Sequence, residues 1–148
     1  MTLFELLDSL SISLHDANLR SFQMDYVHRR LTLDVEVCIG EPEVEDRRVV
    51  YRPAILMINE VSFLYVEPPC DTDELHIGSS IRIDAGEIDP ADVKDPLLQH
   101  LRHIGPFTHI FLRELSSSIY FAAGSASMEW TGSEDNRTEA INKLYERR

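Results

Sequence analysis

The chain has 148 residues, enough for one domain with a buried core, and its 43% hydrophobic and 27% charged residues exclude wholesale disorder. Its 26 acidic and 14 basic residues give a formal net charge of −12, which would repel both the phosphates of a nucleic acid and an anionic membrane surface. The same charge would attract a basic protein partner, although acidity also serves simply to keep a cytoplasmic protein in solution.

The N-terminus predicts a short helix. Thr2 and Glu5 have the spacing of a capping box, and leucines follow at helical spacing, so we expect a helix over about residues 3–10. The acidic residues of this segment are not typical of a secretory signal. The longest apolar stretch, residues 54–66, contains two polar residues and is too short to cross a bilayer. We therefore expect a cytoplasmic protein.

A run of strands should follow the helix. Apolar and polar residues alternate over 22–26 and 31–39, with a turn near 28–30, which predicts an antiparallel hairpin with one buried face. Further strands are expected at 48–59, at 61–68 and, from a weaker pattern, at 74–84. Cys38 lies in the alternating run and Cys70 in a loop, and their spacing predicts neither a disulfide framework nor a zinc site.

Helix signals return in the second half of the chain. Asp89 and Asp95 each precede a proline, as helix N-caps do, and the segment 97–104 has an apolar face that includes Leu98 and Leu101. Three short strands are expected within 108–132. Ser133 could cap a last helix over 133–148, whose apolar edge is so narrow that it would fray.

These elements form one domain, residues 1–148, because no linker or internal repeat divides the chain. Strands joined by short turns favour antiparallel pairing. The expected fold is α+β: a curved antiparallel β-meander or partly open barrel with one or two packed helices.

The pair His15-Asp16 stands between the first helix and the first strand, where it could be a reacting centre or a turn. Side chains adjacent in sequence point in different directions on a strand or helix, so we interpret the pair as structural. His15 is expected to be buried and bonded to backbone, and Asp16 to cap the turn. His100 and His103 could share a helix face, but no spacing typical of a zinc site occurs. No catalytic residue, metal or cofactor is predicted.

The segment "LHDANLRSFQMDYVHRRLTLDVEV" resembles the opening of small bacterial domains, some of them grouped with the immunity proteins of polymorphic toxin systems. The resemblance covers about residues 10–37. It implies an α+β domain without catalytic residues that acts through its surface, and it carries over no binding residues.

The sequence therefore favours a non-enzymatic interaction domain with an acidic surface, immunity-like in function. The candidate partner-binding residues form an acidic loop beside the best-defined hairpin: Glu41, Glu43, Glu45 and Asp46. Two alternatives stay open, a carrier with an apolar pocket for a small ligand and an enzyme of unrecognised class. A homodimer also stays open, while nucleic acid and membrane are not expected as partners.

Overall fold

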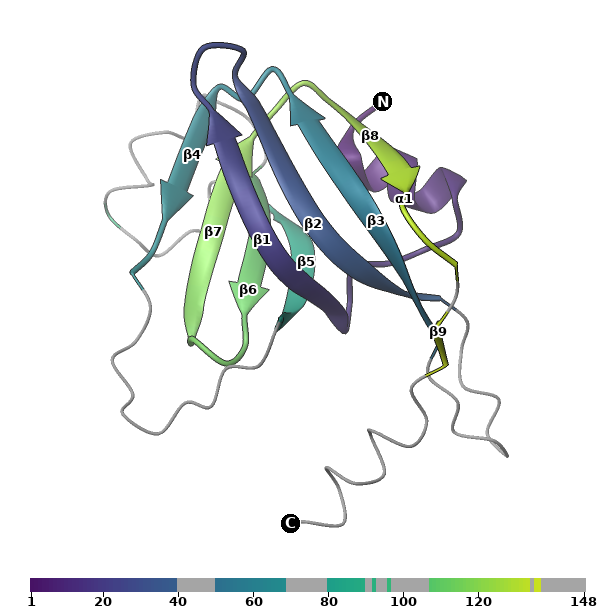
Figure 1. The fold of residues 1–148 in the computed structure, drawn as a ribbon. Coiled ribbons are helices and arrows are strands. Elements are labelled where there is room, and N and C mark those ends of the chain that lie inside the picture. The colour runs from purple at the N-terminus through teal and green to yellow at the C-terminus, as the bar shows by residue number, and fades with distance from the viewer. Residues whose placement is uncertain are drawn as a thin grey trace.

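The computed structural model describes residues 1–39, 50–68, 80–89, 92, 96, 107–133 and 135–136. Within them, one helix accompanies a nine-stranded sheet in which every strand pairing is antiparallel (Figure 1). The elements are α1 (Leu3–Ser9), β1 (Ala17–Asp25), β2 (Arg30–Ile39), β3 (Val50–Asn59), β4 (Phe63–Val66), β5 (Ile81–Ile88), β6 (Phe107–Leu112), β7 (Ser117–Ala122), β8 (Ser125–Trp130) and β9 (Asp135–Asn136).

The sheet consists of two matching halves. Strands β1-β2-β3 form one meander and β5-β6-β7 another, and the two are joined where β1 pairs with β5. Strand β4 follows β3 in the chain but pairs with β7, while β8 follows β7 but pairs with β3. The halves thus exchange their fourth strands. The order β4-β7-β6-β5-β1-β2-β3-β8 has the same pattern when it is followed from either end: an exchanged fourth strand, then the three strands of one meander.

The two crossing connections bind each other. The N–H of Ser62 donates to the carbonyl of Ala122 at 2.9 Å, and the N–H of Gly124 donates to the carbonyl of Asn59 at 3.1 Å. The expected meander therefore exists twice, in three-stranded form, instead of once along the whole chain. Within the part of the chain that the structure describes, the sheet is curved and open, since β4 and β8 end its two sides without pairing to each other.

The fold is mainly β, which corrects the α+β expectation. The first helix is confirmed together with its capping box, in which the N–H of Thr2 donates to the carboxylate of Glu5 at 2.7 Å. The expected helix over 97–104, with Leu98 and Leu101, lies outside the described residues. The start of the expected C-terminal helix is wrong: Asp135 and Asn136 instead form β9 along the part of β3 that β8 leaves unpaired.

Strand β1 begins five residues before the alternating pattern predicted. A register shift between Leu19 and Ser21 interrupts the alternation, so Ala17 and Leu19 face the core and Arg20 and Ser21 are both exposed. A bulge of this kind hides the first part of a strand from a search for strict period-two alternation.

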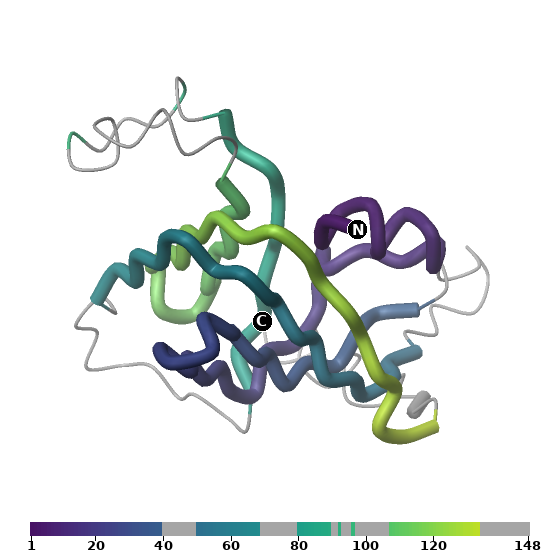
Figure 2. The backbone as a smooth tube through the Cα atoms, turned by 90° about the horizontal axis from the view of Figure 1, so that it is seen from above, coloured from purple at the N-terminus to yellow at the C-terminus, as the bar shows by residue number. Residues whose placement is uncertain are grey.

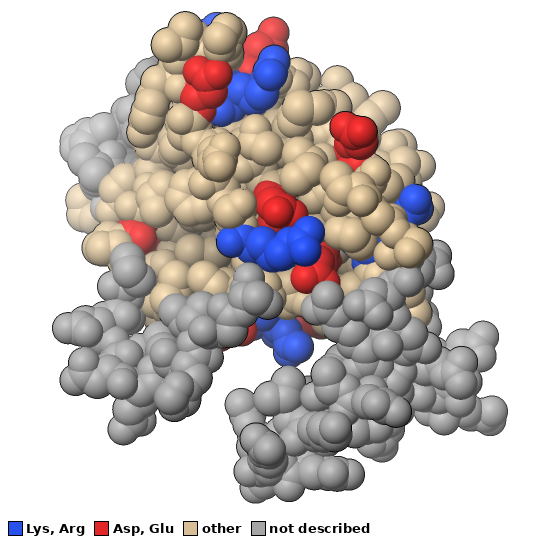
Figure 3. All heavy atoms as spheres, in the orientation of Figure 1, with Lys and Arg blue, Asp and Glu red and all other residues tan. Residues whose placement is uncertain are grey.

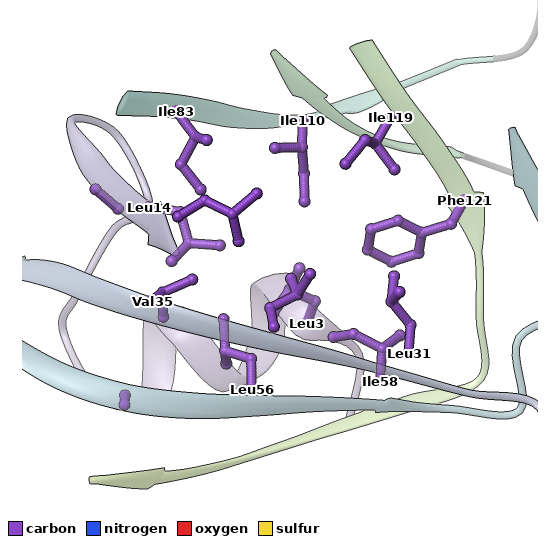
Figure 4. Close-up of a cluster of buried hydrophobic side chains, with 14 of the residues drawn as sticks. Leu3, Leu14, Leu31, Val35, Leu56, Ile58, Ile83, Ile110, Ile119 and Phe121 are labelled. Atoms are coloured by element: carbon purple, nitrogen blue, oxygen red, sulfur yellow. The ribbon is translucent and has the colours of Figure 1, made fainter. Parts of the chain in front are cut away.

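The core lies inside the curve of the sheet, between its two halves. Leu31, Leu33, Val35 and Val37 are fully buried there, which confirms the predicted face of β2. Figure 4 shows side chains of β5, β6 and β7 pointing toward those of β2 and β3, with Leu3 of α1 among them. Helix α1 lies at the β8 side of the sheet, as Figure 2 shows from above, and the carbonyl of Met1 accepts the N–H of Ala126 at 2.9 Å.

No helix among the described residues is long and apolar enough to cross a membrane.

Candidate functional site

Four ionisable side chains meet where the turn before β1 approaches β5 and the β6–β7 turn. His15 and Asp16 come from the first turn, Asp84 from β5, and Arg113 from the residue after β6. We call these four residues the charge cluster. The backbone positions them, since the N–H of Asp16 donates to Oδ1 of Asp84 at 3.4 Å and the N–H of Arg113 donates to the carbonyl of Arg82 at 3.0 Å.

Arg113 bridges the two carboxylates of the charge cluster. Its Nη2 lies 2.7 Å from Oδ2 of Asp84 and 2.8 Å from Oδ1 of Asp16, and its Nε donates to the same oxygen of Asp84 at 2.7 Å. The other oxygen of each carboxylate faces the imidazole of His15, whose Nδ1 contacts Asp84 and whose Nε2 lies 3.3 Å from Asp16. Each acid is thus shared between a guanidinium and an imidazole.

The structural role expected for His15 and Asp16 is wrong in its details. The His15 side chain is 67% exposed and contacts carboxylates, whereas it was expected to be buried against backbone. The Asp16 carboxylate contacts Arg113 and His15 and does not cap the turn. The reason is backbone geometry: Asp16 has φ 60°, a left-handed conformation in which neighbouring side chains need not diverge as they do on a strand or helix.

The charge cluster shifts the acidity of two of its members. Burial alone would raise the pKa of Asp84, but hydrogen bonds from Arg113 and from the Asp16 N–H, with the nearby positive charges, lower it below its usual value. The hydrogen bond to Asp84 in turn raises the pKa of Arg113. Both shifts favour the charged forms of this ion pair.

The charge cluster also brings together donors for a cation. One ligand atom from each of His15, Asp16 and Asp84 lies within 4.8 Å of the other two, and imidazole with two carboxylates is a set that divalent metals accept. Arg113, however, already occupies one oxygen of each carboxylate and supplies the positive charge that a metal would bring. The geometry therefore favours an ion-pair network that ties the turn before β1 to β5.

A serine–histidine pair on β6 and β7 was also not predicted from the sequence. Nε2 of His109 and Oγ of Ser118 lie 2.7 Å apart, and the His109 ring stacks on Tyr120 with 4.7 Å between ring centres. Burial lowers the pKa of His109, while the charge of Glu67 opposes this. Ser118 is only 6% exposed, so the hydrogen bond satisfies a buried polar group.

On the face of β1 and β2 that points away from the core, acids are paired with a base. Nη2 of Arg20 lies 2.9 Å from Asp34, and Nη1 lies 3.9 Å from the buried Glu36. Figure 3 shows that the acidic and basic side chains of the described residues lie next to one another on the viewed face, where these residues form no single-sign patch. The described acids are therefore not concentrated on that face.

The predicted partner-binding residues, Glu41, Glu43, Glu45 and Asp46, lie outside the described residues, as do His100 and His103. Cys38 is a half-buried free thiol, and burial, followed by the charge of Asp16, raises its pKa. Nothing local in the sequence could have revealed the charge cluster, because Asp84 follows Asp16 by 68 residues. A scan against protein-family models finds no match, and searches of curated proteins and of solved structures find no similar protein.

Proposed function

We propose that this protein is a non-enzymatic interaction domain that binds a protein partner through its surface. The observation that carries the proposal is the filled interior: the space between the two halves of the sheet is occupied by fully buried aliphatic and aromatic side chains. A pocket between α1 and the sheet, lined by residues that include Phe4, Ile58 and Phe121, has a volume of only about 70 Å³. Sites for small organic ligands usually measure roughly 300–1,000 Å³.

The filled interior also weighs against the alternative of a small-ligand carrier, because the pocket beside α1 would hold little more than water. An enzyme is less well supported than an interaction domain for two further reasons. The charge cluster is internally paired through Arg113, and Ser118 is a buried residue whose side chain is bonded to His109. These observations favour a function exerted by the outer surface.

The net charge of −12 supports a basic partner, whose encounter with the acidic loop Glu41, Glu43, Glu45 and Asp46 would be accelerated. An immunity-type role, in which the partner is a toxin, is the specific form that we propose from the resemblance of residues 10–37. The cytoplasm is the proposed location.

A pull-down from native lysate tests the proposal. It compares the wild-type chain with a variant neutralised at all four loop positions (Glu41→Gln, Glu43→Gln, Glu45→Gln and Asp46→Asn). The matched control neutralises four exposed acids elsewhere: Asp8→Asn, Glu87→Gln, Asp92→Asn and Glu129→Gln. Each sample is run at about 50 mM and about 500 mM salt, where the screening length falls from more than ~10 Å to less than ~8 Å.

We expect one partner to be recovered with the wild type and the control at low salt. The loop variant should recover less of it, and the difference should shrink at high salt. Recovery of no partner in any sample would contradict the interaction function. Equal yields from all three proteins at both salt concentrations would remove the electrostatic role of the loop.

A further inference from the structure

The two most exposed large apolar side chains among the described residues are neighbours at the tip of the β1–β2 hairpin. Tyr26 is 80% exposed and Val27 is 87% exposed, well above the other exposed hydrophobic side chains. The hairpin carries them to one end of the sheet, at the top of Figure 1. Single exposed apolar side chains are common, whereas adjacent ones that project together are typical of recognition surfaces, and here two of them are neighbours. We call residues 26–29 the hairpin tip.

The hairpin tip is held in one conformation by Asp25. Its Oδ1 accepts the N–H groups of Val27 and His28, each at 3.0 Å, and its Oδ2 lies 2.8 Å from Nδ1 of His28. Arg29 closes the turn in a left-handed conformation with φ 51°. A carboxylate that satisfies two successive backbone N–H groups fixes the backbone of the turn, and so the side from which the two apolar side chains project, before any partner binds.

The neighbouring β3–β4 turn braces the hairpin tip. The N–H of Val61 donates to the carbonyl of Arg29 at 2.9 Å, and Nε of Arg30 donates to Oδ1 of Asn59 at 3.0 Å. Since the β3–β4 turn is itself bonded to the end of β7, the tip projects from a platform of three joined connections. Little backbone conformational entropy would be lost when such a tip enters a partner.

The charge of the hairpin tip differs from that of the whole chain. Arg29 is exposed and forms no ion pair with any described residue, whereas the carboxylate of Asp25 is already used inside the turn. Tyrosine and arginine are among the residues that most often dominate binding energy in protein interfaces. An exposed tyrosine, valine and arginine on a rigid turn therefore match a protein recess with an apolar floor and an acidic rim.

We propose that the hairpin tip inserts Tyr26 and Val27 into an apolar recess of the protein partner, with Arg29 meeting an acidic group on its rim. The inference rests on the proposed interaction function and names the surface that anchors it. A membrane is a poorer occupant, because the chain as a whole carries a net charge of −12. A second copy is also poorer, since it carries the same net charge of −12 and would be repelled. The tip is one anchor of a larger contact.

Site-specific photocrosslinking tests the position of the contact. The crosslinking amino acid p-benzoylphenylalanine replaces Tyr26 in the full chain in its native cells, and in the control it replaces the moderately exposed Phe111. We expect position 26, and not position 111, to crosslink the protein that the pull-down recovers. Equal crosslinking from both positions, or none from position 26, would overturn the inference.

Further arms distinguish the other occupants. A crosslinked pair of copies, at twice the 17.0 kDa of the chain, would assign the tip to self-association and overturn the inference. Cosedimentation with vesicles of phosphatidylcholine and phosphatidylglycerol that depends on Tyr26 and Val27 would assign the tip to a membrane and would also overturn the inference. If the pull-down recovers a partner that position 26 does not crosslink, the inference fails while the interaction function stands. If neither experiment finds a partner, both fail.

Affinity measurements with the recovered partner complete the test. The double variant Tyr26→Ser, Val27→Ser should bind at least tenfold more weakly than the control Leu10→Ser, which changes an exposed leucine on another surface. Arg29→Glu should slow association, with the larger effect at low salt. Unchanged affinity of the double variant, or faster association of Arg29→Glu, would contradict the apolar contact and the acidic rim respectively.

Discussion

Replacing Asp84 by asparagine should destabilise the protein by loosening the joint between the two halves of the sheet. That joint is short, because β1 and β5 pair over only three residue pairs. Asp84 reinforces it by binding Arg113 through two 2.7 Å contacts and by accepting the N–H of Asp16. The asparagine keeps the size of the side chain and removes its charge.

The expected cost follows from how far the ion pair is exposed. The side chains of Asp84 and Arg113 are 33% and 32% exposed, between a surface pair and a buried one. Exposed ion pairs contribute about 0.2–1 kcal/mol, and hydrogen bonds to charged groups contribute about 1.5–3 kcal/mol. We therefore expect Asp84→Asn to lower the free energy of unfolding by about 1–2 kcal/mol, which corresponds to a fall in Tm of roughly 2–8 °C for a chain of this size.

The assay is urea unfolding followed by the fluorescence of Trp130, the single tryptophan of the chain. Glu87→Gln, an exposed acid on the same strand, is the matched control. A double-mutant cycle with Arg113→Gln should give a coupling free energy of at least about 0.5 kcal/mol. The reasoning would be refuted if Asp84→Asn cost no more than the control, or if the two substitutions were simply additive.

The pH dependence of the free energy of unfolding provides a second check on the role of Asp84. The folded-state pKa of Asp84 is lowered, so its contribution is present above the unfolded value of about 3.9 and is lost as the pH falls through the lower folded value. Asparagine does not titrate. The difference in stability between the wild type and Asp84→Asn should therefore shrink as the pH falls below about pH 4.

Three further outcomes are expected. Leu33→Ala should lower the free energy of unfolding by about 2–5 kcal/mol in the urea assay, because it empties a fully buried site at the centre of β2; a cost below 1 kcal/mol would mean that the core is loosely packed there. Arg113→Ala should let added Zn²⁺ raise the Tm more than it does in the wild type, since the change frees the carboxylates of Asp16 and Asp84. An equal rise in Tm in both proteins would refute the view that the guanidinium competes with a metal. Asp25→Ala should speed amide hydrogen exchange at Val27 and His28, whose N–H groups the carboxylate protects. In the wild type this protection should fade as the pH falls through the pKa of Asp25, which hydrogen bonds from His28 lower. Unchanged exchange would show that the turn does not depend on the carboxylate.

Local patterns in the sequence predict the parts of the fold that depend on local forces. The capping box of α1 requires only Thr2 and Glu5, and the buried face of β2 follows from strict alternation at Leu31 and Leu33. Alternation identifies a strand but carries no information on its partner. That is why the pairing of β4 with β7, and of β8 with β3, could not be predicted.

The charge cluster was beyond prediction for the same reason. Its members come from three separate parts of the chain. The turn that places Asp16 beside Asp84 also requires a left-handed backbone at Asp16, and the sequence has no glycine or asparagine at that position to indicate one. The hairpin tip is an intermediate case. The turn near residues 28–30 was predicted, but the exposure of Tyr26 and its bracing by the β3–β4 turn depend on contacts across the fold.

The exchange of fourth strands has a consequence for biosynthesis. While the chain emerges from the ribosome, β3 is complete after Asn59, but the strand that covers its edge, β8, begins only at Ser125. At typical rates of about 5–20 residues per second, that edge stays uncovered for several seconds and is open to pairing with other nascent chains. Strand β4 likewise has no pairing partner until β7 has been made, so neither half can complete its four strands alone. We therefore expect folding to be slow and to be completed in one cooperative step after Trp130 has been made.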